Sequence, residues 1–265
     1  MKKKISIWLA VVAVYGIGLV VACRNQGTHI GAGASPMVAQ EPATPTASQP
    51  GALDIPCVTL TQGTKAWGFS QYFWKNKHEF AVKFLDGDAS SEAKVKSAVQ
   101  AWTQAANIKF VWVQSGNADI RISFRGVGHW SRVGTDALNV PQTSPTMNLQ
   151  LTANDGQDEF NRVARHEFGH ALGLMHEHQH PGFAIQWNKP AVYKWYSSPP
   201  NMWSHDVVDK QVFAVYSGPF TGTEPDSKSI MMYPILPGWT LNGFTVGWNR
   251  DLSPLDKAFI KQKYP

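Results

Sequence analysis

Cysteine is scarce in this chain of 265 residues, which contains only Cys23 and Cys57. Two cysteines exclude the dense disulfide framework on which many small extracellular domains depend. Charged residues are also few, at 16%, and beside 43% hydrophobic residues they give an ordinary globular balance. The formal net charge of +5 includes Lys2, Lys3 and Lys4, so that +2 remains if this segment is removed. Such a charge is too small to indicate nucleic acid or another anionic partner.

Long apolar runs are also missing after residue 23, and the one such run lies at the N-terminus. Residues 1–22 combine a basic start, an apolar stretch and a small residue at Ala22, which predicts a signal peptide. An uncleaved membrane anchor is the alternative, because the stretch is nearly long enough to span a bilayer. The residues Leu19-Val20-Val21-Ala22 before Cys23 resemble a bacterial lipobox. We therefore expect export and lipid anchoring to the cell envelope through Cys23, at the outer membrane if the source is Gram-negative.

Residues 23–56 are rich in Ala, Pro, Thr, Ser, Gly and Gln and have almost no apolar periodicity. Such a segment cannot bury enough surface to fold alone, so we expect a flexible, lipid-anchored linker. The globular part is then residues 57–265. If Cys23 carries lipid, Cys57 has no disulfide partner within the chain, and we expect it to be a small buried hydrophobic residue.

Apolar periodicity predicts a mixed sheet with two long helices in the first part of this globular region. Strands are expected at residues 79–85, 108–113, 118–124, 130–134 and 147–151, and long helices at residues 90–107 and 158–172. Residues 115–117 (Ser-Gly-Asn) are interpreted as the turn between two of the strands. Beyond His180 the chain is rich in Pro and Gly, which predicts an irregular region with helices at 189–196 and 202–213 and a closing helix capped by Ser253.

Residues 166–176 read H-E-F-G-H-A-L-G-L-M-H. On a helix, His166 and His170 lie about 40° apart around the axis, so both imidazoles project from one face and can share a metal ion. Gly173 can adopt a positive φ, end the helix and turn the chain. His176 can then approach the same ion as a third ligand.

Three neutral imidazoles leave a tetrahedral Zn²⁺ with one position open to water, as in a catalytic site and unlike a structural one. Zinc lowers the pKa of that water to near neutrality. Glu167 follows the first ligand and is placed to take the proton and later deliver it to the leaving amine. His178 and His180 have no comparable spacing, and we expect them to be solvated loop residues. A Cys57 thiolate that masks the zinc of a latent precursor is an alternative for that cysteine.

These motifs resemble those of the metzincin clan, in which the three-histidine zinc motif is followed by a turn that contains methionine. Ser229-Ile230-Met231-Met232-Tyr233 is similar to that turn, which implies that Met231 packs beneath the ligands. Glu177 and the Met-x-Tyr order look like astacins. In that family the tyrosine can ligate zinc and swing to the substrate oxyanion, which implies a catalytic role for Tyr233. The astacin glutamate pairs with an N-terminus freed by propeptide removal.

The chain departs from astacins after Glu177, where Gln179-His180-Pro181-Gly182 replaces an Arg- and Asp-rich segment, and the disulfides of the family cannot form. We therefore interpret it as an astacin-like bacterial metzincin. The resemblance implies an α+β, metzincin-like (zincin) catalytic domain with a twisted mixed sheet and two long helices over an active-site cleft. An irregular C-terminal subdomain ending in a helix would complete it. Residues 128–134 are similar to an astacin edge strand, and a peptide could add to it along residues 130–134.

The expected function is that of a monomeric, zinc-dependent endopeptidase acting on protein or peptide substrates. Two alternatives remain. The first is a zinc-stabilised binding lipoprotein that uses its 11 Trp residues to hold a surface polymer. The second is a metalloenzyme with the same site residues that hydrolyses a different amide. Glu167 favours an enzyme, because a binding module needs no general base beside an open metal position.

Overall fold

Six strands of the computed structural model form one mixed sheet in the order β1-β5-β6-β4-β2-β3. They are β1 (Val58–Leu60), β2 (Glu79–Phe84), β3 (Lys109–Trp112), β4 (Ile120–Ser123), β5 (Trp130–Arg132) and β6 (Met147–Asn148). The structure describes residues 58–60, 70–75, 77–217 and 221–265. Strands β5 and β6 pair antiparallel, whereas the other pairs in the described sheet are parallel. The predictions on the signal peptide, Cys23, the linker and Cys57 concern residues outside the described ranges.

Strands β3 and β4 were expected at these residues, but the turn between them does not form a hairpin. Both strands run parallel to β2, one on each side of it. Strand β3 ends opposite Val82, where β4 begins, so the connection between them crosses β2 without reversing the chain. The carboxylate of Asp119 accepts a hydrogen bond from Ala81 N (2.8 Å) and fixes the connection to β2. Alternation with period two identifies a strand but not its neighbour.

The helix predicted at residues 90–107 is divided at Val99 into α1 (Ala89–Ala98) and α2 (Gln100–Ala105). In a continuous helix the Ala98 carbonyl would accept from Trp102 N. Here the Arg165 side chain donates to that carbonyl (3.0 Å), and Trp102 N donates to Val99 O instead (3.1 Å). A side chain 67 residues away along the sequence therefore interrupts the helix.

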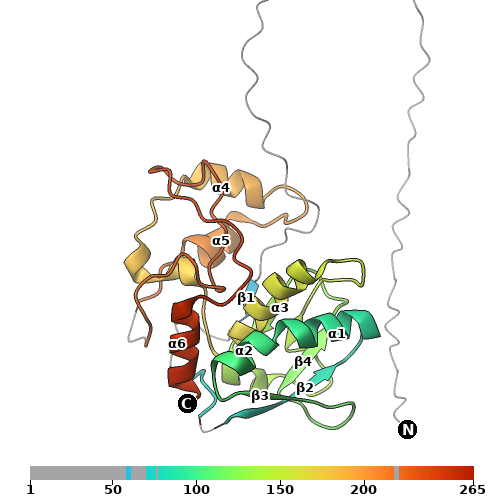
Figure 1. Cartoon of the computed structure of the whole chain (residues 1–265). Helices are drawn as coiled ribbons and strands as arrows, with labels where there is room; N and C mark the ends of the chain where they lie inside the picture. Colours follow the sequence, from blue (N-terminus) through green and yellow to red (C-terminus); the bar gives the residue numbers. More distant parts are fainter. Residues whose placement is uncertain (1–57, 61–69, 76, 218–220) are drawn as a thin grey trace, which may run out of the picture. The chain divides into compact units, whose positions relative to one another are not determined.

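The second long helix, α3 (Gln157–Ala171), confirms the prediction for residues 158–172. Helices α1, α2 and α3 share an apolar core with the sheet, and Figure 1 shows α1 and α2 lying across the strands. The core includes Phe80, Val82, Val95, Trp102, Ile120, Ile122, Phe160 and Phe168. Burying each such side chain contributes roughly 1.5–3 kcal/mol, which holds α3 firmly by its apolar face. His166 and His170 project from another face of α3.

The region beyond His180 is irregular, as predicted, with two isolated β-bridges among its described residues. Its helices are a 3-10 turn (Pro181–Phe183), α4 (Lys189–Tyr196), α5 (His205–Val208), a π-helical turn (Asp209–Phe213) and α6 (Pro254–Lys263). A second apolar cluster there is built from Val192, Tyr196, Val208, Val212 and Trp239, among others. Ser253 and Asp256 form a capping box at the start of α6. Among the residues that the structure describes, no helix is both long and apolar enough to cross a membrane.

Candidate zinc and active site

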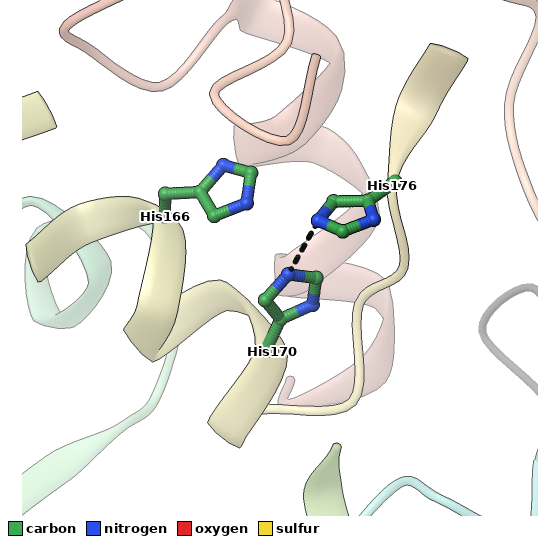
Figure 2. A group of neighbouring side chains, drawn as sticks. All are labelled: His166, His170 and His176. Carbon is green, nitrogen blue, oxygen red and sulfur yellow. Dashed lines mark hydrogen bonds between the residues drawn. The ribbon is translucent and has the colours of Figure 1, made fainter. Parts of the chain in front are cut away.

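The three histidines of the sequence motif converge on one point. His166 and His170 project from α3, and His176 comes from the segment that follows it, as Figure 2 shows. Their ligand atoms all lie within 4.8 Å of one another, and the Nε2 atoms of His170 and His176 are 3.1 Å apart. The structure therefore brings together the three predicted ligands.

The sharp turn after α3 brings His176 back to the helix. Gly173 has φ +103°, and the chain closes in a Schellman motif in which Leu174 N donates to Gly169 O and Gly173 N to His170 O. A Cβ at position 173 would lie 3.0 Å from the Phe73 ring, so glycine is required on both conformational and steric grounds. The last carbonyl of the turn, at Leu172, accepts from the hydroxyl of Tyr264 (2.8 Å).

Backbone carbonyls set which ring nitrogen carries the proton in two of the three histidines. His166 Nδ1 lies 2.7 Å from Ile230 O, and His170 Nδ1 lies 2.8 Å from Leu174 O. A carbonyl can only accept, so each Nδ1 carries the proton and each Nε2 offers a lone pair. Burial lowers the pKa of His170 to about 4, which keeps the ring neutral. Among the residues that the structure describes, the buried Nε2 of His166 has no hydrogen-bond partner, and this atom fits a Zn²⁺ ion held by the three imidazoles.

Glu167 and Tyr233 line the same cavity beside His166, the first of the predicted zinc ligands. The cavity has about 390 Å³ of space, part of it open to solvent, and His166 is in its wall. Glu167 is only 1% exposed. The guanidinium of Arg162 stacks 4.2 Å from the Trp248 ring and forms another part of the wall. The cavity thus combines side chains of α3 with Tyr233 and Trp248 from the irregular region.

The methionine turn packs beneath the zinc helix. Met231 is buried against Gly169, where any Cβ would overlap the methionine sulfur. Its backbone carbonyl accepts from Glu177 N (2.9 Å). Asp256 at the start of α6 accepts from Ile230 N (2.8 Å), which fixes the turn from the other side. This position agrees with what the metzincin resemblance implied for Met231.

The expectation that His178 and His180 are solvated is wrong, because they are 2% and 5% exposed. His178 Nε2–H donates to Gln211 O (3.0 Å), and its ring stacks on that of Tyr233. His180 Nδ1 accepts from Gly182 N (2.9 Å). His178 is buried by Gln211 and Tyr233, which lie 33 and 55 positions further along the chain. The spacing of residues around the zinc motif therefore does not predict its burial.

Glu177 is also buried, and burial raises the pKa of its carboxyl to about 8. Its Oε1 accepts from Asp226 N (2.9 Å), and it lines a second cavity together with Asp226 and Asp256. The astacin-like pairing of Glu177 with a freed N-terminus stays a prediction, since it depends on residues outside the described part of the chain.

Strand β5 does not have the free edge that was expected for substrate. It pairs with β6 on one side and with β1 on the other, where Val58 lies opposite Trp130 and Leu60 opposite Arg132. The expectation of unpaired backbone groups at residues 130–134 is therefore wrong for residues 130–132, which β1 covers. A three-residue strand directly after Pro56 and Cys57 is too short for periodicity to reveal it. A peptide can add at this edge only after β1 leaves.

Comparison with known proteins agrees with the geometry of the site. Residues 69–265 match the family model named Astacin, which describes a family of peptidases. The chain belongs to the astacin family. This result confirms the resemblance drawn from the zinc motif and the methionine turn, and the α+β metzincin-like fold is confirmed as well.

This astacin-family chain is also similar to individual solved structures and curated proteins. It is similar to myroilysin, with a TM-score of 0.70 and 42% identity over 74% of this chain and 97% of that one. High choriolytic enzyme 1, a hatching enzyme zinc-protease of the medaka Oryzias latipes, shares the fold at 20% identity with a TM-score of 0.50, over 75% of this chain and 96% of that one. Human matrix metalloproteinase-20 is 36% identical over 140 residues, which are 48% of this chain and 28% of that protein. The chain thus spans less than a third of the length of the curated relatives it matches.

Proposed function

We propose that this astacin-family protein is a zinc-dependent endopeptidase that hydrolyses peptide bonds in protein or peptide substrates. One observation carries the proposal. A single cavity is lined by a zinc ligand (His166), a buried carboxylate (Glu167) and a phenol (Tyr233). These are the groups needed to activate water and to stabilise a tetrahedral intermediate.

Zinc, when bound by His166, His170 and His176, lowers the pKa of a water ligand and polarises the substrate carbonyl. Glu167 accepts the proton of the attacking water and delivers it to the nitrogen of the leaving amine. The Tyr233 phenol donates a hydrogen bond to the oxyanion as charge develops on it. Both groups are nearly inaccessible to solvent, so they act at low local dielectric, where hydrogen bonds to charge are strongest.

A binding lipoprotein without catalysis is less well supported. Its aromatic residues would have to face solvent, yet Trp74, Trp102 and Trp239 are buried in the two apolar clusters. It would also have no use for Glu167 beside the metal. An enzyme that hydrolyses another amide would keep the same groups, and profiling of substrates separates it from the peptidase.

We further propose that the protein is exported and held at the cell envelope, at the outer membrane of a Gram-negative source, by lipid on Cys23. Residues 23–56 would serve as a tether, and the catalytic domain would act as a monomer without a nucleic-acid partner. The order of basic start, apolar stretch and lipobox-like residues supports this proposal.

The test is a peptide library incubated with the purified protein, with and without a zinc chelator, for wild type and Glu167→Ala. We expect cleavage that zinc restores, and a loss of at least about 100-fold in Glu167→Ala, with zinc still bound at one per chain. Asp158→Ala, an exposed carboxylate on the same helix, is the matched control and should keep wild-type turnover. Near-normal turnover in Glu167→Ala would overturn the mechanism, and loss of its zinc would make Glu167 a ligand instead of a base.

A further inference from the structure

His178 is a buried histidine next to the zinc site that is not one of its ligands. Its ring lies 4.2 Å from that of Tyr233, with only 24° between the two planes. The zinc ligand His176 contacts the same phenol ring, at 4.3 Å and 58°. Two imidazoles therefore pack on the Tyr233 ring, and one of them belongs to a predicted zinc ligand while the other does not.

The plane of His178 is fixed by a hydrogen bond. Its Nε2 lies 3.0 Å from Gln211 O, and since a carbonyl only accepts, the proton of this neutral ring is on Nε2. Nδ1 is then a bare acceptor, and it is buried without a hydrogen-bond partner among the described residues. An unpaired buried acceptor is unfavourable, and a phenylalanine would fill the same space without it. Packing alone does not explain a histidine here.

The carbonyl that accepts from His178 lies in the π-helical turn Asp209–Phe213. The side chain of Gln179 also donates to this turn, at Lys210 O (3.0 Å). Two consecutive side chains after the third zinc ligand are thus tied to two consecutive carbonyls of one short element. Helical distortions of this kind are frequent at functional sites.

We propose that His178 is a positioning residue that orients the Tyr233 phenol for catalysis, with its flat face against the phenol ring and its Nε2–H bond to Gln211 fixing its own plane. This inference rests on the proposed function, in which Tyr233 donates to the oxyanion. A tyrosine hydroxyl lies at the end of a long side chain, so a small tilt of the ring moves the hydroxyl by a large part of an ångström. Displacements of about 1 Å can reduce turnover by about 100-fold.

The test separates stacking from hydrogen bonding and asks whether each acts through Tyr233. His178→Gln keeps a donor but removes the ring, and His178→Phe keeps a ring but removes the donor. Each is combined with Tyr233→Phe in a double-mutant cycle, with kcat, KM, zinc content and melting temperature measured on one preparation. His180→Gln is the matched control, because it is another buried histidine of the same segment, and its Nδ1 accepts from Gly182 N two residues away.

We expect His178→Gln to lower kcat about 10-fold or more, with KM and zinc content nearly unchanged, and His178→Phe to lower it less. In the Tyr233→Phe background the same changes should lower kcat by less than about 2-fold, because the hydroxyl that His178 orients is already gone. His180→Gln should leave kcat near wild type.

Equal losses in both backgrounds would overturn the inference, as would a fall in kcat that merely follows zinc content or melting temperature. The Tyr233→Phe single variant tests the proposed function by itself, with an expected loss of about 10- to 1000-fold. If that variant keeps wild-type kcat, the oxyanion role of Tyr233 fails, and the role of His178 fails with it. If its kcat falls but the cycle is additive, only the inference on His178 fails.

Discussion

Asp256 links the closing helix to the zinc site, and its replacement should weaken both stability and zinc binding. Its buried carboxylate accepts three hydrogen bonds, from Ser229 Oγ (2.7 Å), Ile230 N (2.8 Å) and Ser253 N (2.9 Å). The carbonyl of Ile230 in turn accepts from the zinc ligand His166. A side chain on α6 therefore holds Ile230, the residue whose carbonyl orients a predicted metal ligand.

The magnitude follows from the groups that Asp256→Ala would leave without a partner. Two buried backbone N–H groups lose their acceptor, at about 1–3 kcal/mol each, and the buried Ser229 hydroxyl loses its acceptor as well. We expect the free energy of unfolding to fall by about 3–5 kcal/mol once the lost packing is included. Loss of such outer-sphere support also weakens metal affinity, by about 10- to 100-fold. Asp256→Asn should lose less of both, because one carboxylate oxygen accepts both backbone bonds and an amide oxygen can replace it.

Urea unfolding of the zinc-free protein measures the stability term, and competition with a chromogenic chelator measures zinc affinity. Val95→Ala is the control, because it removes buried volume at α1, a different element from α6 and the methionine turn. It should lower stability and leave zinc affinity unchanged. If Asp256→Ala binds zinc as tightly as Val95→Ala does, the link from α6 to His166 is not what orients that ligand.

Three further predictions concern the edge of the sheet, acid stability and the N-terminus. Removal of residues 1–61, which include β1, should raise the rate of peptide cleavage, because the backbone groups of β5 can then pair with a substrate strand. An unchanged rate would show that substrate does not add at this edge. Burial, together with the nearby charge of Arg162, lowers the pKa of His129 from 6.5 to about 3. The contribution of its neutral ring to stability is therefore present above pH 6.5 and is lost as the pH falls toward 3, with a slope of up to about 1.4 kcal/mol per pH unit. His129→Asn, which can keep an acceptor for Gln150 N, should lose less unfolding free energy than wild type in urea titrations across this range, and an equal loss would contradict the assignment. Mass spectrometry of the mature protein should find an acylated N-terminal Cys23, and an unmodified peptide that begins elsewhere would exclude the lipoprotein prediction.

The sequence by itself determined the features that depend on neighbours along the chain. The spacing of His166 and His170 on one helical face and the turn at Gly173 are local properties, and the structure shows both. The positions of the main strands and of α3 followed from periodicity for the same reason. Ser253 was recognisable as the cap of the last helix because a capping box lies within four residues.

Tertiary structure decided which of these elements meet. The side chain of Arg165 donates a hydrogen bond to the Ala98 carbonyl and so interrupts a helix. Strand β2 lies between β3 and β4, which follow each other in the chain. Strand β1 covers the edge that the sequence suggested for substrate. His178 became buried because Tyr233 and the turn at residues 209–213 fold onto it. Apolar periodicity shows only which side of a helix or strand is buried. The element that packs on that side comes from a distant part of the chain, so a local sequence pattern does not identify it.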